Sequence, residues 1–256
     1  MIEAVIFDWA GTTVDFGSFA PVQAFISAFE KFGITPTVQE VREPMGMLKR
    51  DHIRTMMEMP RIHKEWIEIY GKEFMEADVD AVYECSEKAI MGILKDFANP
   101  KPYVLDVVKE LRNKKIKIGS TTGYTDEMMD IVVPAAKANG YAPDYWCSAN
   151  AVGQKGRPFP YMIFKNLKKL EVSCVGNAIK VGDTVSDIKE GKAAGMCSVG
   201  IVEGSSVMGL SEEEFNGLSE EEKREHSDRV RRVYEECSAD YVIQNMSELP
   251  ALIQSL

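Results

Sequence analysis

The sequence predicts an α/β protein in which an all-helical domain is inserted into a doubly wound parallel sheet. Three observations support this fold class. The apolar run 4–7 is bounded by turn signals, as in a short buried strand. Residues 21–97 show helical periodicity and no convincing strand. After Pro100, helices alternate with short apolar strands, which is the pattern of a parallel sheet.

The elements follow in order from these patterns. Ser18 and Pro21 indicate the start of the first helix, Gly33 its end, and Pro44 and Pro60 further breaks. The second half predicts helix 104–114, strand 116–121, helix 125–139, a strand near 145–147, helix 161–170, strand 179–182, helix 184–194 and strand 197–202. Residues 211–232, with glutamates followed by arginines, are typical of a solvated surface helix.

The position of the helical stretch indicates two domains. The first strand has no neighbour of its own kind until after residue 100. We therefore expect residues 1–18 and 99–256 to form a Rossmann-like catalytic core, and residues 19–98 to form a helical cap. The cap would cover the carboxyl ends of the strands, where parallel sheets bind ligands.

Composition narrows the function classes. The chain has 256 residues, of which 45% are hydrophobic and 27% charged, enough for a full core. Its net charge of -10 argues against nucleic-acid binding. Apolar runs are only strand-sized and no leader is evident, so we expect a cytoplasmic protein without a membrane partner. Five scattered cysteines and three histidines predict neither a disulfide framework nor a zinc site.

The first strand delivers Asp8 into a glycine-containing turn at the edge of the sheet where chemistry is expected. Two positions later stands Ala10, which offers only a backbone carbonyl. A second carboxylic acid there could protonate a leaving alcohol. Taken alone, an aspartate at a strand end is more often a turn or N-cap residue than a nucleophile.

Three further strand ends carry groups suited to a phosphoryl group and a hard cation. The stretch 118–123 ends in the Thr122 hydroxyl and glycine-turn amides, a phosphate cradle. Asp183 and Asp187 lie one helical turn apart and, with Asp8 and the Ala10 carbonyl, form an all-oxygen set typical of Mg²⁺. Arg157 supplies a forked cation for the remaining phosphoryl oxygens. Each has a plainer interpretation: helix caps for the threonine and aspartates, a surface cation for the arginine.

The motifs DWAGTT, STTG, GRPFP and GDTVSD, in this order and over the whole chain, resemble the haloacid dehalogenase (HAD) superfamily. The resemblance implies that Asp8 is the nucleophile and that Thr122 and Arg157 bind phosphate. It also implies that Asp183 and Asp187 serve a magnesium ion. Ala10 departs from phosphomonoesterases of that superfamily, which carry an aspartate there as general acid and base.

The cap offers another way to activate a leaving group. Met45, Lys49, His52 and Met56 recur at the spacing of one helix face. Desolvation on such a face would lower the pKa of Lys49 from about 10.4 toward the range in which its free amine attacks a carbonyl. An iminium beta to phosphorus would accept the electrons of a breaking carbon–phosphorus bond, so no acid is needed at position 10. On spacing alone, a snorkelling lysine beside packed methionines is the commoner arrangement.

DWAGTT combined with PMGMLK resembles the phosphonoacetaldehyde hydrolase (phosphonatase) family, in which the cap lysine forms a Schiff base. The resemblance implies hydrolysis of phosphonoacetaldehyde to acetaldehyde and phosphate in 2-aminoethylphosphonate degradation, through Lys49 and an Asp8 acyl phosphate. It further implies that Met45, His52, Gly123 and Tyr124 line the closed site and that a homodimer forms through the cap.

Alternatives remain open at this point. One is a magnesium-dependent phosphatase or phosphomutase acting on a small phosphate ester, which Ala10 disfavours. A metal-independent dehalogenase has little use for Asp183 and Asp187, and a silent binding protein little use for the complete set. The group that activates water against the acyl phosphate has only His52 as a weak candidate. Ser18 is expected to cap a helix rather than contact the site.

Overall fold

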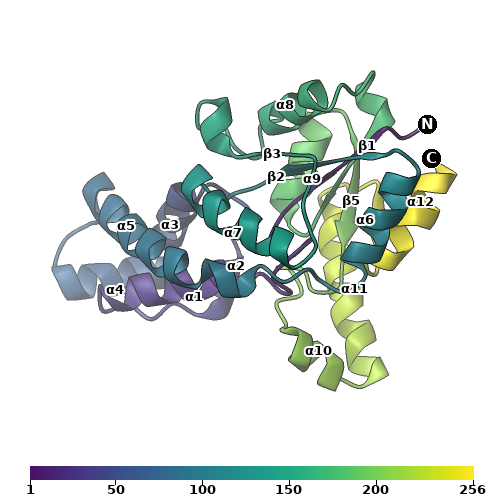
Figure 1. Ribbon diagram of the computed structural model, residues 1–256. Helices are drawn as coiled ribbons and strands as arrows, with labels where there is room; N and C mark the ends of the chain where they lie inside the picture. The colour runs from purple at the N-terminus through teal and green to yellow at the C-terminus, as the bar shows by residue number, and fades with distance from the viewer.

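The apolar run at the N-terminus forms the central strand of a parallel sheet in the computed structural model, which describes residues 1–256 (Figure 1). The strands lie in the order β3-β2-β1-β4-β5-β6, and all of their pairings are parallel. They are β1 (Ala4–Phe7), β2 (Lys117–Thr121), β3 (Tyr145–Cys147), β4 (Ala178–Gly182), β5 (Cys197–Ile201) and β6 (Tyr241–Ile243). The predicted doubly wound sheet is confirmed.

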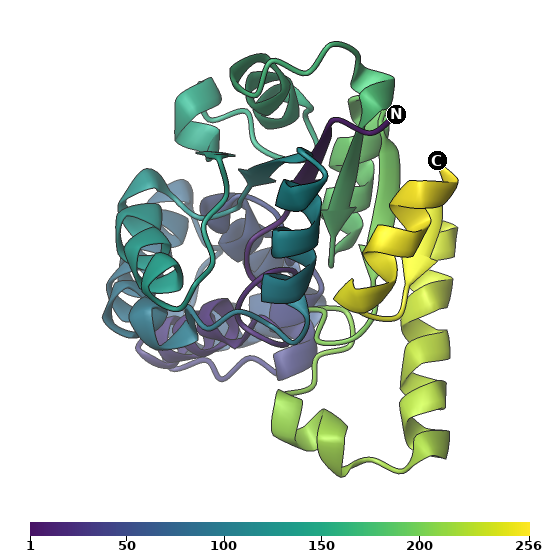
Figure 2. The same cartoon turned by 45° about the vertical axis from the view of Figure 1, so that its right-hand side comes forward.

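Helices cover both faces of the sheet. Successive side chains of β1 point to opposite faces, so alternate residues of this strand pack with different helices. Val5 and Phe7 pack with buried residues of α6 (Val104–Asn113), α7 (Asp126–Ala138) and α12 (Leu249–Ser255). Ala4 and Ile6 pack instead with α8 (Tyr161–Lys169), while α9 (Val185–Ala193) adjoins β4 and β5. α10 (Glu212–Gly217) projects beyond the sheet (Figure 2), whereas α11 (Glu220–Glu236) packs against β5, where the Tyr234 hydroxyl donates to the Ile201 carbonyl at 2.9 Å.

Residues 19–97 contain helices and no strand, as predicted, and form a group to one side of the sheet (Figure 1). The helices are α1 (Phe19–Glu30), α2 (Val38–Arg42), α3 (Lys49–Glu58), α4 (Pro60–Tyr70) and α5 (Glu76–Ile93), followed by the 3₁₀ turn Leu94–Phe97. Fourteen buried residues between Val22 and Val82 form a hydrophobic cluster of their own. This helical segment therefore has a core that is separate from that of the sheet.

Most predicted elements are confirmed to within one or two residues, but the C-terminal end of the chain was missed. β6 is a three-residue edge strand that is only partly buried, so it carries no strong apolar pattern. The stretch 211–232 forms two helices rather than one, because Ser211 and Ser219 each cap a helix start. None of the helices combines the length and apolar character that crossing a membrane requires.

The start of α1 corrects the expectation for Ser18. The backbone of Ser18 is in the left-handed conformation, and its side chain makes no N-cap hydrogen bond to α1. Instead, the buried Asp15 carboxylate accepts hydrogen bonds from the backbone N–H groups of Phe19 and Ala20, at 2.9 and 3.0 Å. The sequence pattern missed this cap because Asp15 lies outside the usual N-cap position.

The separate core of the helical segment generates a stability prediction. Phe29→Ala removes a fully buried ring from that core and should lower the free energy of unfolding by about 3–5 kcal/mol. Phe164→Ala truncates a ring that is 42% exposed and should change it by less than about 1 kcal/mol. Urea denaturation of the two variants measures the difference. Equal losses would contradict the role assigned to this cluster.

Candidate active site

The turn after β1 brings Asp8 against the carboxyl end of β4. The Asp8 backbone N–H donates to the Val181 carbonyl at 2.9 Å, and the residue is only 5% exposed. Gly11 then takes a φ of +82°, and a Cβ atom there would lie 2.1 Å from the Asp183 carboxylate. The turn therefore requires glycine in order to pack Asp8 beside Asp183.

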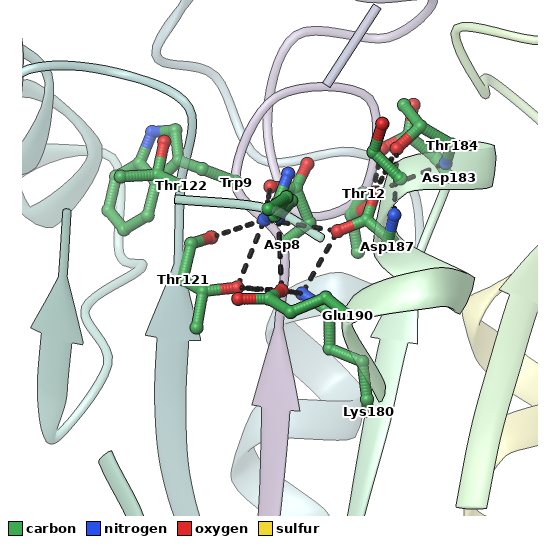
Figure 3. Close-up of polar contacts among 12 residues, drawn as sticks. Asp8, Trp9, Thr12, Thr121, Thr122, Lys180, Asp183, Thr184, Asp187 and Glu190 are labelled. Carbon is green, nitrogen blue, oxygen red and sulfur yellow. Dashed lines mark hydrogen bonds and ion pairs between the residues drawn. The ribbon is translucent and has the colours of Figure 1, made fainter. Parts of the chain in front are cut away.

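Three buried carboxylates meet at this edge of the sheet: Asp8, Asp183 and Asp187 offer oxygens within 4.8 Å of one another. Asp183 accepts a hydrogen bond from the Thr12 hydroxyl at 2.8 Å (Figure 3) and another from the Ser206 backbone N–H at 2.7 Å. Asp187 accepts a hydrogen bond from the Thr184 hydroxyl at 2.6 Å. The three predicted metal-binding carboxylates are thus brought together.

Two buried cations lie among these carboxylates. Arg157 contacts the Asp8 carboxylate directly and lies 3.0 Å from Asp187. Lys180, on β4, lies 2.9 Å from Asp187 and 3.2 Å from Glu190 of α9. Sequence reasoning did not single out Lys180 or Glu190. The signal was a lysine inside an otherwise apolar strand, because a fully buried charge requires partners.

The charges at this edge do not balance, and this favours a cation. When all six groups are ionised, the carboxylates of Asp8, Asp183, Asp187 and Glu190 outnumber Arg157 and Lys180 by two. Burial raises the pKa of Asp8 to about 8, and the neighbouring carboxylates add to this rise while Arg157 opposes it, so added positive charge is needed for Asp8 to be fully ionised near neutral pH. The buried Asp187 Oδ1 has no hydrogen bond. A buried all-oxygen set with excess negative charge fits Mg²⁺.

A small, partly open cavity adjoins the carboxylates. Eight of the predicted site residues line it: Asp8, Ala10, Met45, Lys49, Thr122, Gly123, Tyr124 and Arg157. Ser18, Pro21, Gly46, Thr184 and Ser206 line it as well, and sequence reasoning assigned none of these to the site. The cavity therefore lies between the helical segment and the ends of the strands.

Lys49 is the first residue of α3 and is only 7% exposed. Its Nζ lies 5.4 Å from the ring centroids of both Phe25 and Tyr124, and it makes no ion pair. Burial lowers the pKa of Lys49 to about 8, although Asp8 opposes this shift. The uncharged amine is therefore much more populated near neutral pH than it is in an exposed lysine.

Lys49, His52 and Met56 lie on the buried face of α3 as expected, but Met45 does not. Met45 precedes α3 and reaches the cavity from the preceding turn. His52 lies on α3 but outside the cavity lining, and its Nε2 contacts the Val41 carbonyl at 2.8 Å. Burial and the nearby Lys49 hold its pKa well below the usual range, so the imidazole is neutral.

The turn that carries Met45 rests on the sheet domain. Gly46 has a φ of +88°, and a Cβ atom there would lie 2.6 Å from the Thr184 hydroxyl. Arg42, on α2, donates hydrogen bonds to the carbonyls of Gly17 at 2.6 Å and Ser206 at 3.2 Å. These contacts hold the helical segment against the carboxylates.

Comparisons with known proteins agree with this geometry. A family model of haloacid dehalogenase-like hydrolases matches residues 2–195. Proteins named phosphonoacetaldehyde hydrolase from Lysinibacillus sphaericus and Bacillus anthracis are 49% and 48% identical, covering 100% of this chain and 95% and 96% of their own.

Solved structures give the same result. A phosphonoacetaldehyde hydrolase-like protein from Oleispira antarctica matches with a TM-score of 0.96 at 38% identity, over 99% of this chain and 92% of its own. A beta-phosphoglucomutase from Clostridium difficile, at 19% identity and a TM-score of 0.64, shares the fold. The chain belongs to the haloacid dehalogenase-like hydrolases and, among them, to the phosphonoacetaldehyde hydrolase family.

Proposed function

We propose that this protein hydrolyses phosphonoacetaldehyde to acetaldehyde and phosphate, in the degradation of 2-aminoethylphosphonate. The names of the full-length relatives support this assignment. The observation that carries it is that Lys49 and Asp8 line the same cavity, with Ala10 where an acid would otherwise stand. Lys49 beside Asp8, together with the lack of an acid at position 10, fits a reaction whose leaving group needs no proton as it departs.

The division of labour follows the two hydrophobic cores. We assign residues 1–18 and 99–256 to the catalytic core and residues 19–98 to the cap. The cap contributes Lys49 and Met45, and the core contributes Asp8, Thr122 and Arg157. The cap would open to admit substrate and close to exclude water from the reacting atoms.

Lys49 would begin the reaction. Its uncharged amine attacks the aldehyde carbon, and loss of water leaves an iminium between Nζ and that carbon. Tyr124 and Phe25 both lie close to Nζ, with ring centroids 5.4 Å away, and help to keep the amine desolvated. His52, which is neutral and outside the cavity, would support α3 behind Lys49 rather than transfer a proton.

Asp8 would then attack phosphorus. A bond forms between an Asp8 oxygen and phosphorus while the carbon–phosphorus bond breaks, and its electron pair moves into the C=N bond to give an enamine. Protonation at carbon and hydrolysis release acetaldehyde and free Lys49, and water cleaves the acyl phosphate to phosphate. No alkoxide is formed, so Ala10 carries no penalty.

The phosphoryl oxygens would be held by Thr122, the amide of Gly123 and Arg157, all of which border the cavity. Asp8, the Ala10 carbonyl, Asp183 and Asp187 would hold Mg²⁺. The ion, when bound, supplies positive charge against the phosphoryl oxygens.

We further propose a cytoplasmic homodimer that forms through the cap. Val38, Ile69, Tyr70 and Met75 are apolar cap residues with 41–56% exposure. All five cysteines are unpaired, which suits a reducing compartment.

Borohydride trapping tests the role of Lys49. Borohydride added with substrate should fix a stable adduct on Lys49, found by peptide mass spectrometry, and Lys49→Ala should abolish turnover. Lys101 is an internal control, because it is equally buried but donates to the carbonyls of Glu203 and Gly204 and lies outside the cavity. An adduct on Lys101, or none on Lys49, would contradict the mechanism.

The pKa of Lys49 can be measured directly. Only the free amine reacts with acetic anhydride, so labelling of Lys49 should rise with pH and reach half its maximum at about pH 8. The cause is burial, which disfavours the ammonium form. Peptide mass spectrometry after brief labelling reports the midpoint. A midpoint at about 10.4, the value of an exposed lysine, would show that the amine is not desolvated.

Simple phosphate esters should be poor substrates. Without an acid at position 10, we expect phosphate release from sugar phosphates at least about 100-fold more slowly than from phosphonoacetaldehyde. Ala10→Asp should increase ester hydrolysis. Rapid ester hydrolysis by the unmodified protein that survives Lys49→Ala would instead identify a magnesium phosphatase.

A further inference from the structure

Lys180 is a fully buried cation that cannot touch the substrate. It lies on β4, the neighbour of β1 in the sheet, and is absent from the cavity lining. Its Nζ lies 2.8 Å from the Thr121 hydroxyl, 2.9 Å from Asp187 Oδ1 and 3.2 Å from Glu190 Oε2 (Figure 3). Any effect of Lys180 on the reaction therefore passes through these neighbours.

Glu190 holds both cations of the site through one oxygen. Its Oε2 accepts from Arg157 Nε at 3.0 Å and from the Thr121 hydroxyl at 2.8 Å, and it also faces Lys180. The other oxygen, Oε1, is buried and has no partner. The negative charge of Glu190 thus partly neutralises Arg157 and Lys180. Without it, these two cations would interact more strongly with the carboxylates of Asp187 and Asp8.

The two carboxylate oxygens of Asp187 differ in their contacts. Thr184 holds Oδ2, with its backbone N–H at 3.1 Å and its hydroxyl at 2.6 Å. Oδ1 makes no hydrogen bond yet lies within 3.0 Å of both Arg157 and Lys180. A cation that ligates Asp187 must therefore compete with these two side chains for Oδ1.

We propose that Lys180 and Glu190 form a pair of positioning residues that sets the affinity of the site for Mg²⁺. Lys180 competes with the ion at Asp187 Oδ1 and weakens binding, while Glu190 draws both cations away and strengthens it. The inference rests on the magnesium site of the proposed function, and it concerns binding rather than chemistry.

Two substitutions of similar shape should shift Mg²⁺ affinity in opposite directions. Lys180→Met should lower the Kd for Mg²⁺ and Glu190→Gln should raise it, each by about tenfold or more, because charges this close and this buried are poorly screened. The double variant keeps the net charge of the site and should bind within about threefold of the unmodified protein. Isothermal titration calorimetry with MgCl₂ and no substrate measures all three.

A matched control lies on the surface. Lys192 pairs with Asp240 at 2.7 Å, and both side chains are partly exposed. Lys192→Met should leave the Kd for Mg²⁺ unchanged. Thermal melting by circular dichroism establishes which variants are folded. If one single variant is unfolded, the other carries the test, because its Kd must still shift about tenfold in the stated direction and an unchanged Kd would overturn the inference.

The outcomes separate this inference from the proposed function. Shifts of the same sign, no shift in either single variant, or a double variant more than tenfold from the unmodified protein would each overturn the inference. Unmodified protein that binds Mg²⁺ but releases no acetaldehyde would overturn the function and leave the inference intact. Turnover with a Kd insensitive to both substitutions would do the reverse.

Discussion

Uncompensated negative charge, buried at the carboxyl ends of β1 and β4, is the constraint on which the rest of the site depends. Burying a charge is costly unless it is paired, and here four carboxylates face only two cations. The strand order places these groups together because β1 lies between β2 and β4, where the chain changes direction across the sheet. The remaining excess of negative charge favours the binding of a divalent cation beside a nucleophilic carboxylate.

The helical segment imposes the opposite condition on Lys49. Its amine lies 5.4 Å from the ring centroids of Phe25 and Tyr124 and has no carboxylate partner, so burial disfavours the ammonium form and lowers the pKa of Lys49. The two reactive groups come from different hydrophobic cores. Chemistry is therefore confined to the arrangement in which the helical segment rests on the sheet.

Several contacts that maintain this arrangement involve backbone rather than side-chain chemistry. Gly46 approaches Thr184 more closely than a Cβ atom would allow, and Gly11 does the same at Asp183. Arg42 reaches the Ser206 carbonyl, while the Ser206 N–H donates to Asp183. The position of the helical segment and the orientation of a metal-binding carboxylate are thus physically connected through the backbone of one residue, Ser206.

The sequence alone determined five of the six strands, the helical insertion and the order of Asp8, Thr122, Arg157 and Asp183, because these follow from periodicity and from groups at strand ends. It could not assign Ser18, Ser206, Lys180 or Glu190, whose roles arise from contacts between residues distant in the chain. It also placed Met45 on the helix of Lys49, although α3 begins only at Lys49. Only the tertiary structure decided which charges share a buried volume, since pairing and desolvation depend on distances that local pattern does not encode.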